Sequence, residues 1–194
     1  MIPDEEGIAA VRAARAVTEA ETEGRELDVP LPASFSKRRS GAFVTVNEYP
    51  SRMLRGCIGY PEPVFPLKEA LFYSAQSACH DPRFMPLSEK EAVNCTVEVT
   101  ILSPPVLLDC PKEDIPKNIV IGRDGLIIQF GRRRGLLLPQ VPVEWGWTVD
   151  EYLEQICAKA CLPSDAWKLK DSMMWTFSGE IFREVSPNGE IVRG

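Results

Sequence analysis

Hydrophobic and polar residues alternate most regularly between positions 93 and 101. The apolar positions are Val93, Cys95, Val97, Val99 and Ile101, and the polar positions between them are Asn94, Thr96, Glu98 and Thr100. Successive side chains of a strand point to opposite faces of its sheet. The alternation therefore predicts a strand in a sheet that is covered on one face.

Helical patterns occur in other parts of the chain. Residues 4–23 are rich in Ala and Glu, and residues 67–78 carry small and apolar side chains along one helical face. A capping-box pattern at 148–151 opens a third helix that continues to 159–161, and a similar pattern at 88–91 opens a short one. The sequence thus predicts helices near both ends and in the middle.

The remaining hydrophobic runs are short and bounded by turn residues, which favours strands. One predicted hairpin joins residues 41–47 to 52–58, and a second joins 119–121 to 126–130 through an Asp-Gly turn. We also expect strand segments at 106–108, 136–138, 174–177 and 180–185, and a proline-containing loop at 28–39. Hairpins punctuated by a few helices predict an α+β fold, with antiparallel or mixed sheets and helices packed on them.

Composition narrows the class of protein. The length of 194 residues suits one domain, or two small lobes that share a core. The net charge of −6 opposes nonspecific binding to nucleic acid, which depends on many Lys and Arg contacts to phosphates. No run approaches the about 20 apolar residues that span a bilayer, and the acidic first residues do not resemble a signal peptide. We expect a cytoplasmic protein without a membrane segment, in which the six cysteines are free thiols.

The stretch Leu-Arg-Gly-Cys-Ile-Gly, residues 54–59, combines a guanidinium group, a thiol and two glycines within six positions. Arg55 is a fixed cation whose donors match a carboxylate or phosphate, and a cation near Cys57 would lower the thiol pKa. Gly56 and Gly59 permit close approach of backbone or ligand. The stretch predicts an anion-binding corner that carries a thiol. The alternative is a strand with a bulge, in which Cys57 is a small buried residue.

The same six residues resemble the signature hexapeptide of the AMMECR family, which is named after a human chromosomal region linked to Alport syndrome, midface hypoplasia and elliptocytosis. Further motifs agree with the family in the same order: Gly41-Ala42-Phe43-Val44, Asp81-Pro82-Arg83-Phe84, Leu138-Pro139-Gln140-Val141 with Glu144 and Trp147, and Lys159-Ala160. The resemblance covers roughly residues 8–185. No biochemical activity is established for the family, so the resemblance implies more about fold than about function.

The resemblance implies a single domain over residues 1–194 with two α+β lobes, the smaller one from the middle of the chain, at about 60–115. It places six polar residues on family motif positions without giving them roles: Arg55, Cys57, Asp81, Arg83, Glu144 and Lys159. In microbial relatives the domain can occur with a Memo-type domain and a radical S-adenosylmethionine protein. This association implies a modification pathway with those proteins as partners.

Two main functions follow for a cleft at residues 54–59. In an enzyme or catalytic partner, Cys57 would be a nucleophile or redox thiol, and Glu144 or Lys159 would move protons. The ligand-holding residues would be Arg55, Gly56, Gly59, Asp81 and Arg83. In a binding or adaptor module, the same cleft would recognise an anionic ligand, a peptide or an RNA end. Nucleic-acid binding through the basic runs 37–39 and 132–134 is the least favoured because the net charge is negative.

The sequence gives little support for a metal site or for a catalytic Cys–His pair. Cys157 and Cys161 share a helical face, but structural zinc usually takes paired ligands in two places, so we predict no metal and no cofactor. His80 is the single histidine and would activate Cys57 only if the fold brought them together. The resemblance implies that Cys79, His80 and Cys161 lie outside the family pattern, with glycine usual at position 161.

Overall fold

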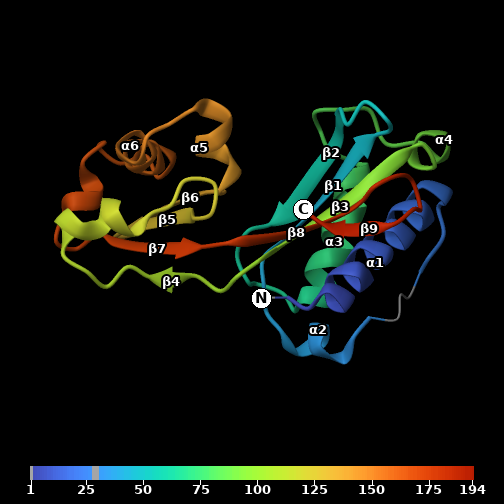
Figure 1. The fold of residues 1–194 in the computed structure, drawn as a ribbon, viewed down its shortest axis with the longest axis horizontal. Helices are drawn as coiled ribbons and strands as arrows, with labels where there is room; N and C mark the ends of the chain where they lie inside the picture. Colours follow the sequence, from blue (N-terminus) through green and yellow to red (C-terminus); the bar gives the residue numbers. More distant parts are fainter. Residues whose placement is uncertain (1, 28–30) are drawn as a thin grey trace. The chain divides into compact units, whose positions relative to one another are not determined.

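The computed structural model describes residues 2–27 and 31–194. The chain divides into two compact units, one formed by Met1–Leu102 with Glu180–Gly194 and the other by Ser103–Gly179. Each unit combines helices with its own sheet (Figure 1). The predicted α+β class is therefore confirmed, with the smaller unit coming from the middle of the chain.

A five-stranded sheet in the order β2-β1-β3-β8-β9 forms the centre of the first unit. Its strands are β1 (Ala42–Glu48), β2 (Leu54–Tyr60), β3 (Cys95–Leu102), β8 (Gly179–Glu184) and β9 (Ile191–Arg193). β1 pairs antiparallel with β2 and with β3, and β8 pairs antiparallel with β9. The predicted hairpin of β1 and β2 is present, and residues 54–59 lie in the edge strand β2.

Two long helices, α1 (Asp4–Glu23) and α3 (Leu67–Cys79), pack on one face of this sheet (Figure 1). Alternate residues of β1 and β3 are fully buried against them: Val44, Val46, Val97 and Val99. The polar residues between them lie on the other face, so the predicted alternation is confirmed from Cys95 onward. Val93 is an exception, because it follows a short helix and is exposed.

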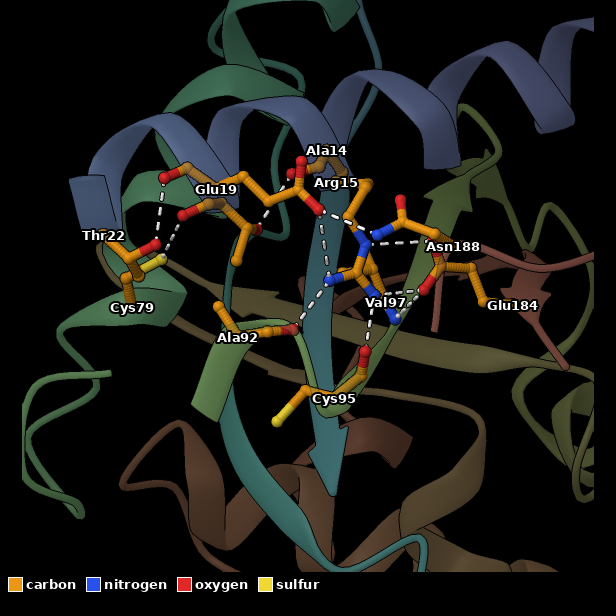
Figure 2. A network of polar contacts seen from close by, with 11 residues as sticks. Ala14, Arg15, Glu19, Thr22, Cys79, Ala92, Cys95, Val97, Glu184 and Asn188 are labelled. Carbon is orange, nitrogen blue, oxygen red and sulfur yellow. Dashed lines mark hydrogen bonds and ion pairs between the residues drawn. The ribbon is translucent and has the colours of Figure 1, made fainter. Parts of the chain in front are cut away.

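A buried ion pair ties α1 to the sheet (Figure 2). The Arg15 guanidinium bonds both carboxylate oxygens of Glu184 and donates to the carbonyls of Ala92 and Cys95. Glu184 also accepts the Val97 N–H at 2.9 Å. Since Arg15 and Glu184 are both buried, their charges depend on one another and on these backbone groups.

Two short helices complete the first unit, α2 (Ala33–Lys37) and α4 (Glu89–Ala92). α4 begins with the predicted capping box: Ser88 accepts the Glu91 N–H, and the Glu91 carboxylate accepts the Ser88 N–H at 2.9 Å. α2 corrects the prediction of a loop throughout residues 28–39, because burial of Phe35 holds a helical turn there. Residues 28–30 of that predicted loop lie outside the described residues.

The second unit contains a four-stranded sheet in the order β4-β7-β5-β6. Its strands are β4 (Val106–Leu107), β5 (Gly125–Phe130), β6 (Arg133–Leu137) and β7 (Met173–Phe177), and its helices are α5 (Gln140–Trp145), α6 (Val149–Lys159), η1 (Lys112–Asn118) and η2 (Ala166–Lys168). α6 starts with the predicted capping box at Thr148 and buries Tyr152, Leu153 and Ile156 in the core of this unit.

Two predictions about the second unit need correction. The hairpin expected between residues 119–121 and 126–130 is absent, because β5 pairs with β6 and β7 and the Asp124 carboxylate closes a turn on the Val120 N–H at 2.8 Å. The smaller lobe, expected at about 60–115, extends instead from Ser103 to Gly179, because α3 and β3 pack into the first sheet. No helix in the described part of the chain is long and apolar enough to cross a membrane.

Candidate functional site around Cys57

The two glycines of residues 54–59 allow close packing within the first unit. A Cβ at Gly56 would lie 2.2 Å from the carbonyl oxygen of Ala78 at the end of α3, and a Cβ at Gly59 would lie 2.4 Å from the carbonyl oxygen of Ala42. No side chain fits at either position. The close approach that these glycines permit is therefore between β2 and its own neighbours.

Arg55 is the extra residue of a bulge in β2, since the pairing with β1 shifts between Val46 and Asn47. The strand with a bulge, one of the two interpretations of the sequence, is what forms. Arg55 is 8% exposed, and its Nε donates to Glu91 at 3.1 Å. Its Nη2 donates to the Pro86 carbonyl at 3.3 Å.

Through these contacts the positive charge of Arg55 is balanced by Glu91 within the protein. Hydrogen bonds from the Ser88 hydroxyl, followed by those from Arg55 and the Ser88 backbone, lower the pKa of Glu91 to about 2. Glu91 thus remains ionised opposite Arg55 at neutral pH. The cation that the sequence predicts to hold a ligand anion fastens β2 to the start of α4.

Asp81 caps the free edge of β2 at Cys57. Asp81 is 2% exposed, and its carboxylate accepts the backbone N–H of Cys57 at 2.9 Å and that of Arg83 at 3.0 Å. The Arg83 side chain donates to Asp81 at 3.0 and 2.6 Å and to the Cys57 carbonyl at 3.3 Å. These bonds, with that of the Arg83 side chain the largest, hold the pKa of Asp81 well below its usual range. Asp81 and Arg83 thus form a salt bridge within their own motif, and their bonds to Cys57 satisfy edge groups that would otherwise attract another strand.

The Cys57 side chain lies on the face of the sheet opposite α1 and α3. Thr45 is paired with Cys57 on one side and with Glu98 on the other, so the three side chains form a row across β2, β1 and β3. The Thr45 hydroxyl donates to Cys57 Sγ at 3.2 Å. We call this surface the polar face and define it by Thr45, Cys57, Thr96, Glu98, Thr100 and Arg183.

Electrostatics keep the thiol protonated. Burial raises the pKa of Cys57 above its ordinary value, and the charges of Asp81 and Glu98 raise it further. The Thr45 hydrogen bond and the Arg83 charge oppose this shift but are outweighed. Cys57 is therefore a neutral thiol at pH 7, unlike the low-pKa thiolate that the sequence suggested beside Arg55.

Glu98 holds its proton more strongly than an exposed glutamate. Burial raises its pKa, and the charges of Arg183 and Arg52 oppose the shift. Sequence reasoning did not single out Thr45, Glu98 or Arg183. The alternation at 93–101 did place Glu98 on the polar side of a strand, but the strand order that puts it beside Thr45 and Cys57 is not readable from the sequence.

His80 does not form a pair with Cys57. Its Nε2 lies 2.8 Å from a carboxylate oxygen of Glu21 on α1. Ile58, on the helix side of β2, lines a hollow of about 350 Å³ together with His80 and Glu21. Because neighbouring residues of a strand point to opposite faces, the Cys57 thiol and the imidazole lie on opposite sides of the sheet.

Glu144 and Lys159 belong to the second unit, so the cluster around Cys57 is described without them. Glu144 lies in α5 and Lys159 ends α6, and both are exposed. The neighbouring Trp145 is 71% exposed and stacks on Trp147 with ring centroids 6.1 Å apart. In the described part of the chain, no group of three His, Cys, Asp or Glu residues is placed to hold a metal ion.

The fold and the capped edge strand define a two-unit α+β protein, and comparison with known proteins identifies its family. The sequence model of the family described as AMMECR1 matches residues 11–182. A protein of Aquifex aeolicus is 50% identical over 174 residues, covering 88% of this chain and 89% of its own. Protein MJ0810 of Methanocaldococcus jannaschii is 50% identical over 192 residues, covering 97% and 94%.

A solved structure agrees with the fold. The crystal structure of the uncharacterized protein PH0010 from Pyrococcus horikoshii is similar with a TM-score of 0.83 and 46% identity, covering 100% of this chain and 98% of that one. The chain belongs to the AMMECR1 family, which confirms the resemblance found in its motifs.

Proposed function

We propose that this protein is a binding module whose polar face recognises a small ligand or a peptide, with Cys57 as a neutral hydrogen-bonding group rather than a nucleophile. The observation that carries the proposal is the row Cys57–Thr45–Glu98, in which the thiol accepts a hydrogen bond from Thr45 at 3.2 Å and burial raises its pKa. Such a row offers donors and acceptors to a ligand without a reactive anion.

The charged residues of the motif support this proposal because each already has a partner. Arg55 is bonded to Glu91, and Arg83 is bonded to Asp81. A reactive cysteine needs a cation that stabilises its thiolate. Here the carboxylates of Asp81 and Glu98 add to the burial that favours the thiol form.

One observation favours catalysis as a second candidate function. A carboxyl group whose pKa is raised toward neutrality is suited to proton transfer, and burial raises the pKa of Glu98. An enzyme using this face would therefore employ Glu98 as its acid or base. Glu144 and Lys159, which lie in the second unit, remain separate candidates for proton transfer.

The proposed cellular setting follows from the family resemblance. We place the module in the cytoplasm, in a modification pathway with a Memo-type and a radical S-adenosylmethionine protein. In that setting the module would hold a substrate or a partner segment while another component carries out the chemistry.

Nuclear magnetic resonance titration of the full ¹⁵N-labelled chain tests the proposal. The probes are acetate, the blocked dipeptide N-acetyl-Ala-Ala-amide and uridine 5′-monophosphate, which represent a simple anion, a peptide and an RNA end. We expect at least one probe, at up to about 10 mM, to shift the amide signals of Thr45, Cys57 and Glu98.

Three variants give this titration its controls. Cys57→Ser keeps a hydrogen-bonding group, so binding should persist, and Cys57→Trp fills the face, so binding should be lost. Cys161→Ser, at an exposed thiol of the second unit, should bind as the unaltered chain does. The proposal fails if no probe shifts these signals, or if Cys57→Ser abolishes binding while its fold is intact.

A further inference from the structure

A small hollow of about 170 Å³ opens at the end of the polar face where β1 turns into β2. Its polar lining includes the side chains of Tyr49, Arg52, Thr96 and Arg183. These residues come from the β1–β2 turn, from β3 and from β8. The hollow therefore lies within the first unit and joins segments far apart in the sequence.

The position of Arg183 follows from its neighbours on β8. Phe182 is buried in the core beneath α1, and the Glu184 carboxylate is paired with Arg15 of α1. Since successive residues of a strand alternate, Arg183 points to the opposite, polar face. Glu184 also borders the hollow, but its charge is neutralised by Arg15.

Arg52 approaches the hollow from a well-defined turn. Its N–H donates to the Glu48 carbonyl at 2.8 Å, and the Glu48 N–H donates to the Met53 carbonyl at 2.9 Å. Arg52 has φ +60°, a conformation that a bulky residue adopts at a cost of about 1–2 kcal/mol. The turn thus fixes the backbone of this arginine beside the hollow.

Neither arginine is used to hold the fold together. Within residues 2–27 and 31–194, neither the Arg52 nor the Arg183 side chain forms a hydrogen bond or an ion pair. Their charged neighbour is Glu98, which both stabilise in its ionised form. Two guanidinium groups that face a small hollow without a partner differ from Arg15, Arg55 and Arg83, which are all paired.

The geometry points to a phosphate-binding subsite in this hollow, in which Arg52 and Arg183, with the Tyr49 hydroxyl, hold the phosphate monoester group of a small ligand. A monoester carries a charge of about −1.5 to −2 at pH 7 and has three acceptor oxygens, which matches two cations and a further donor. The inference rests on the proposed function, since the hollow opens on the same polar face.

Isothermal titration calorimetry with inorganic phosphate and with glycerol 3-phosphate tests the inference. We expect saturable binding of glycerol 3-phosphate with a Kd of about 1 mM or lower. Arg183→Gln and Arg52→Gln should each weaken it at least about tenfold, because each removes a charge-assisted hydrogen bond. Glu98→Gln should tighten binding, because it removes the nearby negative charge.

Arg12→Gln is the matched control, since Arg12 is exposed on α1, which covers the other face of the sheet. It should change the Kd less than about twofold, as expected of a remote surface charge. Equal losses in Arg12→Gln and Arg183→Gln, or no saturable binding, would overturn the inference. Binding of inorganic phosphate alone would contradict the assignment to a monoester.

The outcome can be separated from that of the proposed function. Phosphate binding that depends on Arg52 and Arg183, without any response of Thr45 and Cys57 to acetate or to the blocked dipeptide, which carry no phosphate, would support the subsite and refute recognition at the row. The opposite pattern would support the row and refute the subsite. Thermal unfolding of each variant confirms its fold, and Arg52→Gln, at an exposed turn, provides the test if Arg183→Gln does not fold.

Discussion

The carboxylate of Asp81 accepts the backbone N–H of Cys57 at 2.9 Å, on the side of β2 that has no neighbouring strand. Arg83 completes the contact by donating to the Cys57 carbonyl. Two motifs that are separate in the sequence, residues 54–59 and 81–84, thus form one structural unit. Their polar residues stabilise the sheet edge and fix the position of the Cys57 side chain on the polar face.

Asp81→Asn should destabilise the protein by about 2 kcal/mol at pH 7, because it weakens a buried, charge-assisted contact. The folded-state pKa of Asp81 is lowered, so its contribution is fully present above the unfolded value of about 4. The contribution is lost as the pH falls through the lowered folded-state pKa. Urea unfolding at pH 7 and pH 3 should therefore show a smaller difference between the two proteins at pH 3. Asp171→Asn, at an exposed position, is the control, and a difference independent of pH would contradict this account.

Gly56→Ala should destabilise the first unit by about 3 kcal/mol or more, because the new Cβ would lie 2.2 Å from the Ala78 carbonyl oxygen. Gly24→Ala is the matched comparison. Gly24 has φ +67° but nothing within 4 Å of the added Cβ, so its cost should be about 1 kcal/mol. Urea unfolding midpoints measure both, and equal costs would show that α3 does not restrict Gly56.

Glu184→Gln should cost about 3–5 kcal/mol of stability, since it leaves the buried Arg15 with only the Glu19 carboxylate, 3.9 Å away, as a counter-charge. Glu190→Gln, at an exposed position in the same part of the chain, should stay within about 0.5 kcal/mol of the unaltered protein. Chemical denaturation compares them. A loss below 1 kcal/mol for Glu184→Gln would mean that the pair shown in Figure 2 does not anchor α1.

Cys161→Gly should stabilise the second unit by about 0.5–1 kcal/mol. Cys161 has φ +55° just after α6, where the Leu162 N–H returns to the Cys157 carbonyl at 2.9 Å in a Schellman arrangement. Glycine adopts this conformation without strain, which agrees with the glycine that the family resemblance implies here. Cys161→Ser keeps the strain and should leave the thermal midpoint unchanged, and an equal gain from both variants would contradict the explanation.

Local signals in the sequence predicted the elements well. The alternation around Val97, the capping boxes at Ser88 and Thr148, and the hairpin that carries residues 54–59 all appear in the structure. The predicted partner of β5 was wrong, because the Asp124 carboxylate closes a local turn that resembles a hairpin signal.

The candidate site was harder to predict because it depends on pairing between distant segments. Arg55, Cys57, Asp81 and Arg83 do come together, but no local pattern shows that Arg55 pairs with Glu91 or that Asp81 accepts the backbone N–H of Cys57. The side chains left free for a ligand, Arg52 and Arg183, lie outside the motifs. Strand order alone brings them to one face.

The pH dependence of Cys57 alkylation by iodoacetamide, read by mass spectrometry on the native protein, tests the central claim that this thiol is protonated and not catalytic. We expect half-maximal reactivity at a pH above about 8.5, which is the pKa of a free cysteine thiol. Thr45→Val should move it higher, since the Thr45 hydrogen bond lowers the Cys57 pKa. Half-maximal reactivity below pH 7 would contradict the claim and make Cys57 a thiolate nucleophile.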